Sequence, residues 1–247
     1  GRPWQQTRPT VNSRSHSLYI RHARRIRLSY PVSMVIRYLP LVTAIAPIIG
    51  INIAYWIGVD HGNLPSCIPY LDGCTSISAT GRYPPGDRLF RAVMLPQAVL
   101  LALTWHFAVL WLKSVRPDTR ATGTIIVSGL LGALALIIYV SYLASNDPFY
   151  EVMRRYGIYL YFLGTVIAQI ALTVSMRSSR LRQIMGWLLV MPFVLGIYNF
   201  IQKALVENTD NMENRIEWIV SLLMQLWFVM LYLAWRRSGF KVEVRAG

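Results

Sequence analysis

The sequence is short of charged residues, and especially of acidic ones. Of its 247 residues only 15% are charged, and 11 Asp+Glu stand against 25 Lys+Arg, a formal net charge of +14. A soluble domain usually carries about a quarter charged residues, whereas 54% of this chain is hydrophobic. These proportions exclude a soluble globular enzyme and a disordered tail, and they predict a multi-pass membrane protein.

Cysteine and histidine are almost as scarce. The two cysteines, Cys67 and Cys74, cannot build a disulfide-rich secreted domain or a cysteine-rich metal site. The four histidines do not converge with carboxylates in the way an intramembrane zinc hydrolase requires. His106 lies deep in an apolar stretch, where we expect a packing residue held by a hydrogen bond. We therefore expect no metal, no cofactor and no set of catalytic residues.

Six apolar segments are long enough to cross a hydrocarbon core of about 30 Å as helices. The predicted fold is all-α, a polytopic membrane protein whose six-helix transmembrane domain covers residues 38–235. A basic arm over residues 1–37 precedes this domain and a basic tail over residues 236–247 follows it. The largest connection is a loop over residues 60–88. The predicted spans are residues 38–59, 89–112, 123–144, 157–176, 183–201 and 216–235.

Basic residues gather on one side of this layout. They lie in the arm, in the connections after the second and fourth spans, and in the tail. Because cytoplasmic segments carry the Lys/Arg excess, both termini are predicted to be cytoplasmic, and the loop over residues 60–88 lies on the other side. The same partition explains the net charge without a nucleic-acid partner. The residues are Arg2, Arg8, Arg14, Arg21, Arg24, Arg25, Arg27, Arg37, Lys113, Arg116, Arg120, Arg177, Arg180, Arg182, Arg236, Arg237, Lys241 and Arg245.

Four arginines cluster in the arm just before the first span: Arg21, Arg24, Arg25 and Arg27. A juxtamembrane basic cluster attracts anionic lipid head groups, at about 1 kcal/mol per basic residue. The cluster is therefore a candidate site for anionic phospholipid or a partner protein. The plainer alternative is an anchor that only sets the topology.

Acidic residues are absent from the middle of the predicted spans. Glu217 and Arg91 lie near span ends, where we expect their side chains to extend to the head groups. Small residues such as Gly129 and Gly132 favour the close approach of a neighbouring helix. Neutral amides are expected to join helices by hydrogen bonds: Asn52, Gln97, Gln169, Asn199, Gln202 and Gln225. Tryptophans near span ends predict an interfacial aromatic belt: Trp56, Trp111, Trp187, Trp218 and Trp235.

The loop after the first span holds both cysteines. On the non-cytoplasmic side a local disulfide between Cys67 and Cys74 is favoured over two free thiols. Arg82, Arg88 and Arg91 are candidates to bind lipid phosphates. The alternative interpretation is a folded plug over the helix bundle, which we favour slightly.

The run Ser76-Ile-Ser-Ala-Thr-Gly-Arg-Tyr-Pro-Pro in this loop resembles the "ISDTG…PPE" signature of the Frag/DRAM/Sfk family. The resemblance implies six spans with cytoplasmic termini. Members of that family are implicated in GPI-anchor lipid remodelling, lysosomal autophagy control and the organisation of phosphoinositide kinases. Three family features differ here: the signature acid is Ala79, a His–Asp pair opening span four is replaced by Arg154 and Arg155, and a span-six acid is replaced by Gln225. These losses weaken the transfer of an activity more than that of a scaffold role.

The predicted function is that of a non-catalytic integral membrane protein. It acts as an accessory or scaffold subunit of a larger membrane complex, or as a lipid-associated organiser, with phospholipids and other membrane-protein subunits as partners. The first alternative is a lipid-modifying enzyme, or its cofactor, that works beneath the loop. The second is a small transporter, which the lack of intramembrane carboxylates and of a repeat between the two halves disfavours.

Overall fold

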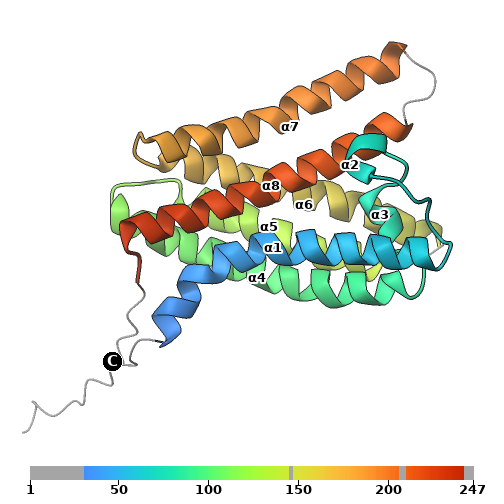
Figure 1. Cartoon of the computed structure of the whole chain (residues 1–247). Helices are drawn as coiled ribbons and strands as arrows, with labels where there is room; N and C mark the ends of the chain where they lie inside the picture. Colours follow the sequence, from blue (N-terminus) through green and yellow to red (C-terminus); the bar gives the residue numbers. More distant parts are fainter. Residues whose placement is uncertain (1–30, 145–146, 206–209, 242–247) are drawn as a thin grey trace, which may run out of the picture.

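The computed structural model describes residues 31–144, 147–205 and 210–241, with side chains from Ile36 onward. Every regular element in these residues is a helix, and six of the helices are long and apolar enough to cross a bilayer (Figure 1). The predicted all-α, six-span fold is confirmed, while the side on which the termini lie stays a prediction. The helices are α1 (Pro31–Asp60), α2 (Pro69–Asp72), α3 (Ile77–Thr80), α4 (Gly86–Val115), α5 (Thr122–Ser141), α6 (Pro148–Ser175), α7 (Arg180–Leu205) and α8 (Asp210–Ser238).

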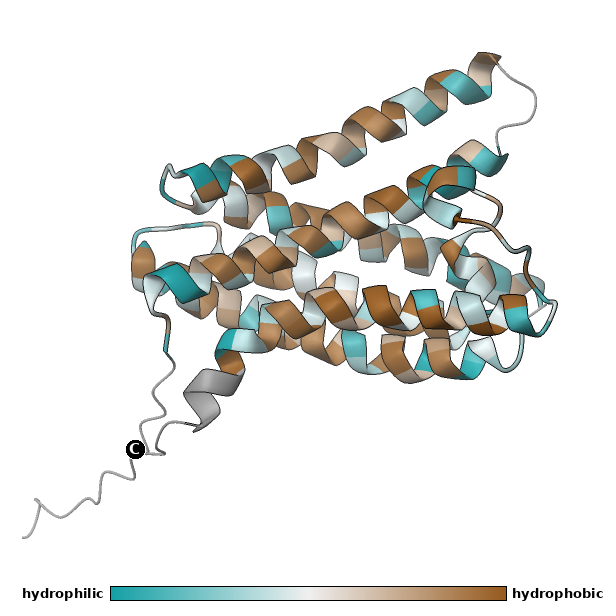
Figure 2. Cartoon of the chain, viewed as in Figure 1, coloured by the Kyte–Doolittle hydropathy of each residue, from teal (hydrophilic) through white to brown (hydrophobic). Residues whose placement is uncertain are grey.

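Most long helices extend beyond the predicted apolar spans. α6 begins at Pro148, well before residue 157, because Asp147 caps it by accepting a hydrogen bond from the Phe149 N–H and proline suits the first helical position. α8 begins at Asp210, and acidic residues in its first turn favour the positive end of the helix dipole. Hydrophobic residues predominate between these polar ends (Figure 2). Helical turns that carry charged residues therefore extend α6 and α8 beyond the apolar spans at the end of the bundle.

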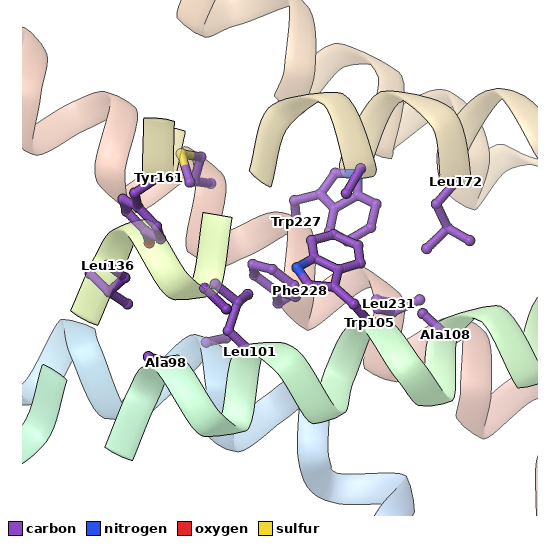
Figure 3. Close-up of a cluster of buried hydrophobic side chains, with 14 of the residues drawn as sticks. Ala98, Leu101, Trp105, Ala108, Leu136, Tyr161, Leu172, Trp227, Phe228 and Leu231 are labelled. Carbon is purple, nitrogen blue, oxygen red and sulfur yellow. The ribbon is translucent and has the colours of Figure 1, made fainter. Parts of the chain in front are cut away.

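The core lies between α1, α4, α5, α6 and α8. Trp105 is fully buried, and its ring centroid lies 5.4 Å from that of Phe228 and 5.9 Å from that of Trp227 (Figure 3). Such aromatic pairs add about 0.5–1.5 kcal/mol each beyond the area they bury. The predicted belt is partly wrong, because Trp218 and Trp235 are buried in the core, whereas Trp56 is exposed.

Two of the predicted amides, Gln97 and Gln169, join helices. Gln97 donates to the carbonyl of Thr43 at 2.7 Å, and Gln169 donates to the carbonyl of Met224 at 3.3 Å. These bonds link α4 to α1 and α6 to α8. The expectation for His106 is wrong, because its side chain is exposed on α4 instead of packed in the core.

α7 is the least buried of the long helices. Its buried residues are Leu181, Met185 and Leu189, all near its N-terminal end. Its C-terminal half, after Pro192, has none, and α7 diverges from α6 toward that end (Figure 1). The bundle is therefore less closed at the end that carries α2 and α3.

Candidate functional site

The loop between α1 and α4 folds into a cap over one end of the bundle. The predicted disulfide is confirmed: Cys67 and Cys74 are bonded, with their Cα atoms 6.5 Å apart. The Tyr55 hydroxyl accepts a hydrogen bond from the Cys67 N–H at 2.9 Å, which fixes the disulfide to α1. This arrangement agrees with the interpretation of the loop as a folded plug over the helix bundle.

Two side chains of α8 hold the cap from the other side. The Trp218 indole N–H donates to the carbonyl of Thr75 at 2.8 Å, and the Asn214 amide donates to the carbonyl of Gly73 at 3.0 Å. The Trp218 ring also packs edge-on against Tyr70 of α2, with centroids 5.0 Å apart. The cap is therefore a folded part of the bundle and bridges α1 and α8.

Removing the disulfide tests how much it contributes to the cap. We expect Cys67→Ser together with Cys74→Ser to destabilise the cap by about 2 kcal/mol, because the bond closes a short loop and restricts its unfolded states. Thermal unfolding in detergent, with and without dithiothreitol, measures this effect. The reductant should lower the midpoint of the wild-type protein and leave the double variant unchanged. An unchanged wild-type midpoint would show that the hydrogen bonds to α1 and α8 suffice.

The family-like run in the cap forms α3 and its flanks. Ser76 is the N-cap and accepts a hydrogen bond from the Ala79 N–H at 3.2 Å. The hydroxyls of Ser76 and Ser78 are hydrogen-bonded at 3.0 Å, and Arg82 donates to the Ser78 hydroxyl at 3.4 Å. The run thus presents Ser78 and Arg82 on one side of α3.

Glu217 of α8 contacts the backbone of α3. Its carboxylate accepts hydrogen bonds from the backbone N–H groups of Ile77 and Ser78, and it lies within electrostatic range of Arg82. The expectation that Glu217 extends outward to the head groups is therefore wrong. The carboxylate turns inward because the cap supplies N–H donors that hydrocarbon does not.

A cavity of about 700 Å³ lies beneath the cap. Its walls come from α3, α5, α6, α8 and the C-terminal half of α7, segments that are far apart in the sequence. On α6 the lining residues recur at helical spacing and form one face. The polar lining residues are Ser78, Arg82, Tyr139, Glu151, Arg154, Arg155, Tyr159, Asn199, Glu213, Asn214 and Glu217.

Ion pairs organise the outer part of this cavity. Glu151 accepts from Arg155 at 3.0 Å and lies 3.8 Å from Arg154, so two guanidinium groups share one carboxylate. Arg154 also donates to the carbonyl of Leu143 at 3.3 Å, and its side chain is only 19% exposed. Lys203 at the end of α7 pairs with Glu213 at 2.7 Å. Positive charge is therefore concentrated on the α6 wall.

Further along α6 and α8 the lining becomes apolar. Phe162 of α6 and Val220 of α8 lie beyond every polar lining residue of their helices. From Glu151 to Phe162 the α6 wall extends about 16 Å along the helix axis. The cavity is open to the outside, and α7 contributes only Asn199 to its wall. The Asn199 Oδ1 atom is buried and has no hydrogen-bond partner among the described residues.

The structure brings together only part of the predicted lipid-phosphate set. Arg82 lines the cavity, whereas Arg88 and Arg91 lie on α4 and are not among the lining residues. The predicted arm cluster of Arg21, Arg24, Arg25 and Arg27 lies outside the described residues.

Sequence reasoning missed the α6 wall as a site. In the sequence, Arg154 and Arg155 stand out only because they replace the His–Asp pair of the family. The helical spacing of Glu151, Arg154, Arg155 and Ile158 was the available signal for a shared face. Among the described residues, no group of three or more His, Cys, Asp or Glu side chains is placed to hold a metal ion.

The fold and the site define an integral, multi-pass membrane protein with a capped six-helix bundle. A family model described as the Frag1/DRAM/Sfk1/Cwh43P N-terminal domain matches residues 35–237. Because this match covers most of the chain, the protein belongs to that family, as the run in the first loop predicted. Comparison with curated proteins and with solved structures found no significant match.

Proposed function

We propose that the protein binds the head group of a membrane phospholipid in the cavity beneath the cap. In this role it is a non-catalytic, lipid-associated organiser or an accessory subunit of a larger membrane complex. The observation that carries the proposal is the polarity of the cavity. It is lined by charged groups near the cap and by Phe162 and Val220 further along α6 and α8.

This gradient matches the shape of a phospholipid. A volume of about 700 Å³ falls within the range of small-molecule sites. Guanidinium groups bind phosphate through paired, charge-assisted hydrogen bonds, and Arg82, Arg154 and Arg155 supply three of them at the head-group level. The apolar walls fit the upper part of the acyl chains.

The sparse packing of α7 supports entry of the lipid from the bilayer. Its C-terminal half has no buried side chain, and it diverges from α6 on the side of the cavity (Figure 1). Acyl chains that leave the cavity between α6 and α7 stay in contact with apolar surface, such as Tyr159 and Leu163 of α6 and Ile197 of α7. The head group then remains bound while the chains lie in the membrane.

A lipid-modifying activity is the second candidate, because the Ser76–Ser78 hydroxyl pair lies at the cavity wall. A serine nucleophile needs a base within hydrogen-bond distance. The Ser78 hydroxyl instead bonds to Ser76 and Arg82, neither of which is a base. This pattern favours binding of a head group over attack on it.

Native mass spectrometry after gentle release from the source membrane tests the binding proposal. We expect the wild-type protein to retain a phospholipid, and Arg154→Gln and Arg82→Gln each to lower its occupancy about tenfold, since a charge-assisted hydrogen bond contributes about 1.5–3 kcal/mol. The matched control is Arg120→Gln, an exposed arginine at the opposite end of the bundle. Equal lipid retention by all four proteins would contradict the proposal.

The same spectra address the accessory role. Other polypeptides that remain bound to the wild-type protein would support a subunit of a complex. Conversion of added phospholipid by the purified protein, lost in Ser78→Ala, would favour the lipid-modifying candidate instead.

A further inference from the structure

The charges that line the cavity are balanced in number. Three guanidinium groups, on Arg82, Arg154 and Arg155, face three carboxylates, on Glu151, Glu213 and Glu217. A site for a purely anionic head group would be expected to carry a surplus of positive charge, because each buried charge needs a partner. Carboxylates among the lining groups instead match a ligand that carries both signs.

Only part of this charge is paired within the protein. Arg154 and Arg155 on α6 share Glu151, so this wall has positive charge left over. Glu213 on α8 is already paired with Lys203. Glu217 takes part in none of the ion pairs found among the described residues. It accepts hydrogen bonds from the backbone N–H groups of α3 and lies within electrostatic range of Arg82. Glu217 is therefore the carboxylate that a ligand cation can reach.

Tyr139 marks the point where these groups converge. Its side chain lines the cavity and lies within electrostatic range of Glu217, Arg82 and Arg154. A ligand that is seated beside Tyr139 thus meets guanidinium groups and a free carboxylate together. A phosphate joined to an ammonium by a short linker has these two charges at the required proximity.

We propose that the ligand is a zwitterionic phospholipid whose head group joins a phosphate to a primary ammonium. Arg154 and Arg82 bind the phosphate, and Glu217 binds the ammonium. The inference rests on the proposed function, since it names the class of lipid for the same cavity.

A primary ammonium suits this site better than a quaternary one. It carries three N–H donors, and the site offers acceptors that need them. The Glu217 carboxylate is one acceptor, and the buried Asn199 Oδ1 atom, which has no partner among the described residues, is a second. A trimethylammonium group has no N–H, so it would leave the Asn199 Oδ1 atom unbonded and give Glu217 no hydrogen bond beyond those from α3.

Competition between lipids in detergent micelles, followed by native mass spectrometry of the full chain, tests this assignment. With equal amounts of phosphatidylethanolamine, phosphatidylglycerol and phosphatidylcholine, the wild-type protein should bind the ethanolamine lipid about tenfold more than either competitor. Glu217→Gln keeps an acceptor for the α3 N–H groups but removes the charge. It should bring ethanolamine and glycerol lipids to near parity while phosphatidylglycerol binding persists. Asp118→Asn, in the α4–α5 connection at the opposite end of the bundle, is the matched control and should keep the preference.

The outcomes separate this inference from the proposed function. Retention of no lipid in any mixture would overturn both. Retention without a preference for the ethanolamine lipid, or a preference that survives Glu217→Gln, would overturn only the assignment of the head group. Displacement of the lipid by an equal concentration of water-soluble glycerophosphoethanolamine would assign the site to a soluble ligand. It would overturn the proposal that the ligand is a lipid.

A second series needs no variant, in case Glu217→Gln does not fold. Stepwise N-methylation of phosphatidylethanolamine removes one N–H donor at a time and keeps the positive charge. Binding to the wild-type protein should fall at each step. Equal binding of all the methylated lipids would overturn the role given to the N–H donors.

Discussion

Gly164→Val should strongly destabilise the folded bundle. α5 and α6 approach each other so closely that a Cβ atom at Gly164 would lie 2.6 Å from the Ser128 carbonyl oxygen and 2.9 Å from the Gly132 nitrogen. Both are backbone atoms of α5, so no side-chain rotation relieves the overlap. Forcing extra carbon atoms into a packed interface costs about 1–3 kcal/mol, and more where backbone must move. We expect a loss of at least about 3 kcal/mol, a large fraction of the roughly 5–15 kcal/mol that stabilises a folded domain.

Detergent-solubilised protein, heated and then analysed by size-exclusion chromatography, measures this loss. Gly196→Val is the matched control, because a Cβ atom at Gly196 in α7 would meet nothing within 4 Å. The control should elute as a single folded species with a midpoint near that of the wild type. Similar midpoints for both variants would show that α5 and α6 can separate without cost, against the packing described here.

The α5–α6 contact is one of the features that the sequence predicts well. Small residues in the third span indicated a close helix approach, and Gly132 indeed lies against α6. The number of spans is equally predictable from the sequence. Each crossing needs about 20 apolar residues, whatever helices surround it. The Cys67–Cys74 disulfide was predictable for a similar reason, since its partners are close in sequence.

Side-chain direction at span ends was not predictable from hydropathy. Glu217 and Trp218 lie where head groups or an aromatic belt are the default expectation. Both turn inward because the cap, more than a hundred residues away in the chain, offers them backbone partners: N–H groups of α3 for Glu217 and the Thr75 carbonyl for Trp218. A segment examined alone contains no information about such a partner.

The cavity could not be predicted from the sequence for the same reason. Arg82 was selected from its position in the loop, but Arg154 lies in another segment that the predicted span excluded. Only the folding of the cap onto the bundle brings the two to one cavity. The helical start at Pro148, which hydropathy does not report, is what places Glu151 and Arg154 on a common face.

Gly73→Ala should detach the cap from α8 and empty the cavity of lipid. Gly73 has φ +66°, a left-handed conformation that costs other L-residues about 1–2 kcal/mol. A Cβ atom there would also overlap the Asn211 carbonyl oxygen, a backbone atom of α8. The cap must therefore move away and give up the Asn214 and Trp218 hydrogen bonds to Gly73 and Thr75. Because α3 moves with it, Arg82 leaves the cavity wall, and we expect lipid occupancy to fall at least about tenfold.

Gly62→Ala separates the clash from the backbone strain. Gly62 has a similar φ of +70°, but a Cβ atom there would meet nothing within 4 Å. Native mass spectrometry should find the lipid retained in Gly62→Ala and lost in Gly73→Ala, and limited trypsin digestion should cleave faster after Arg82 in Gly73→Ala alone. Loss of lipid from both variants would assign the effect to loop strain. Retention in both would mean that the contact between the cap and α8 is not needed to form the site.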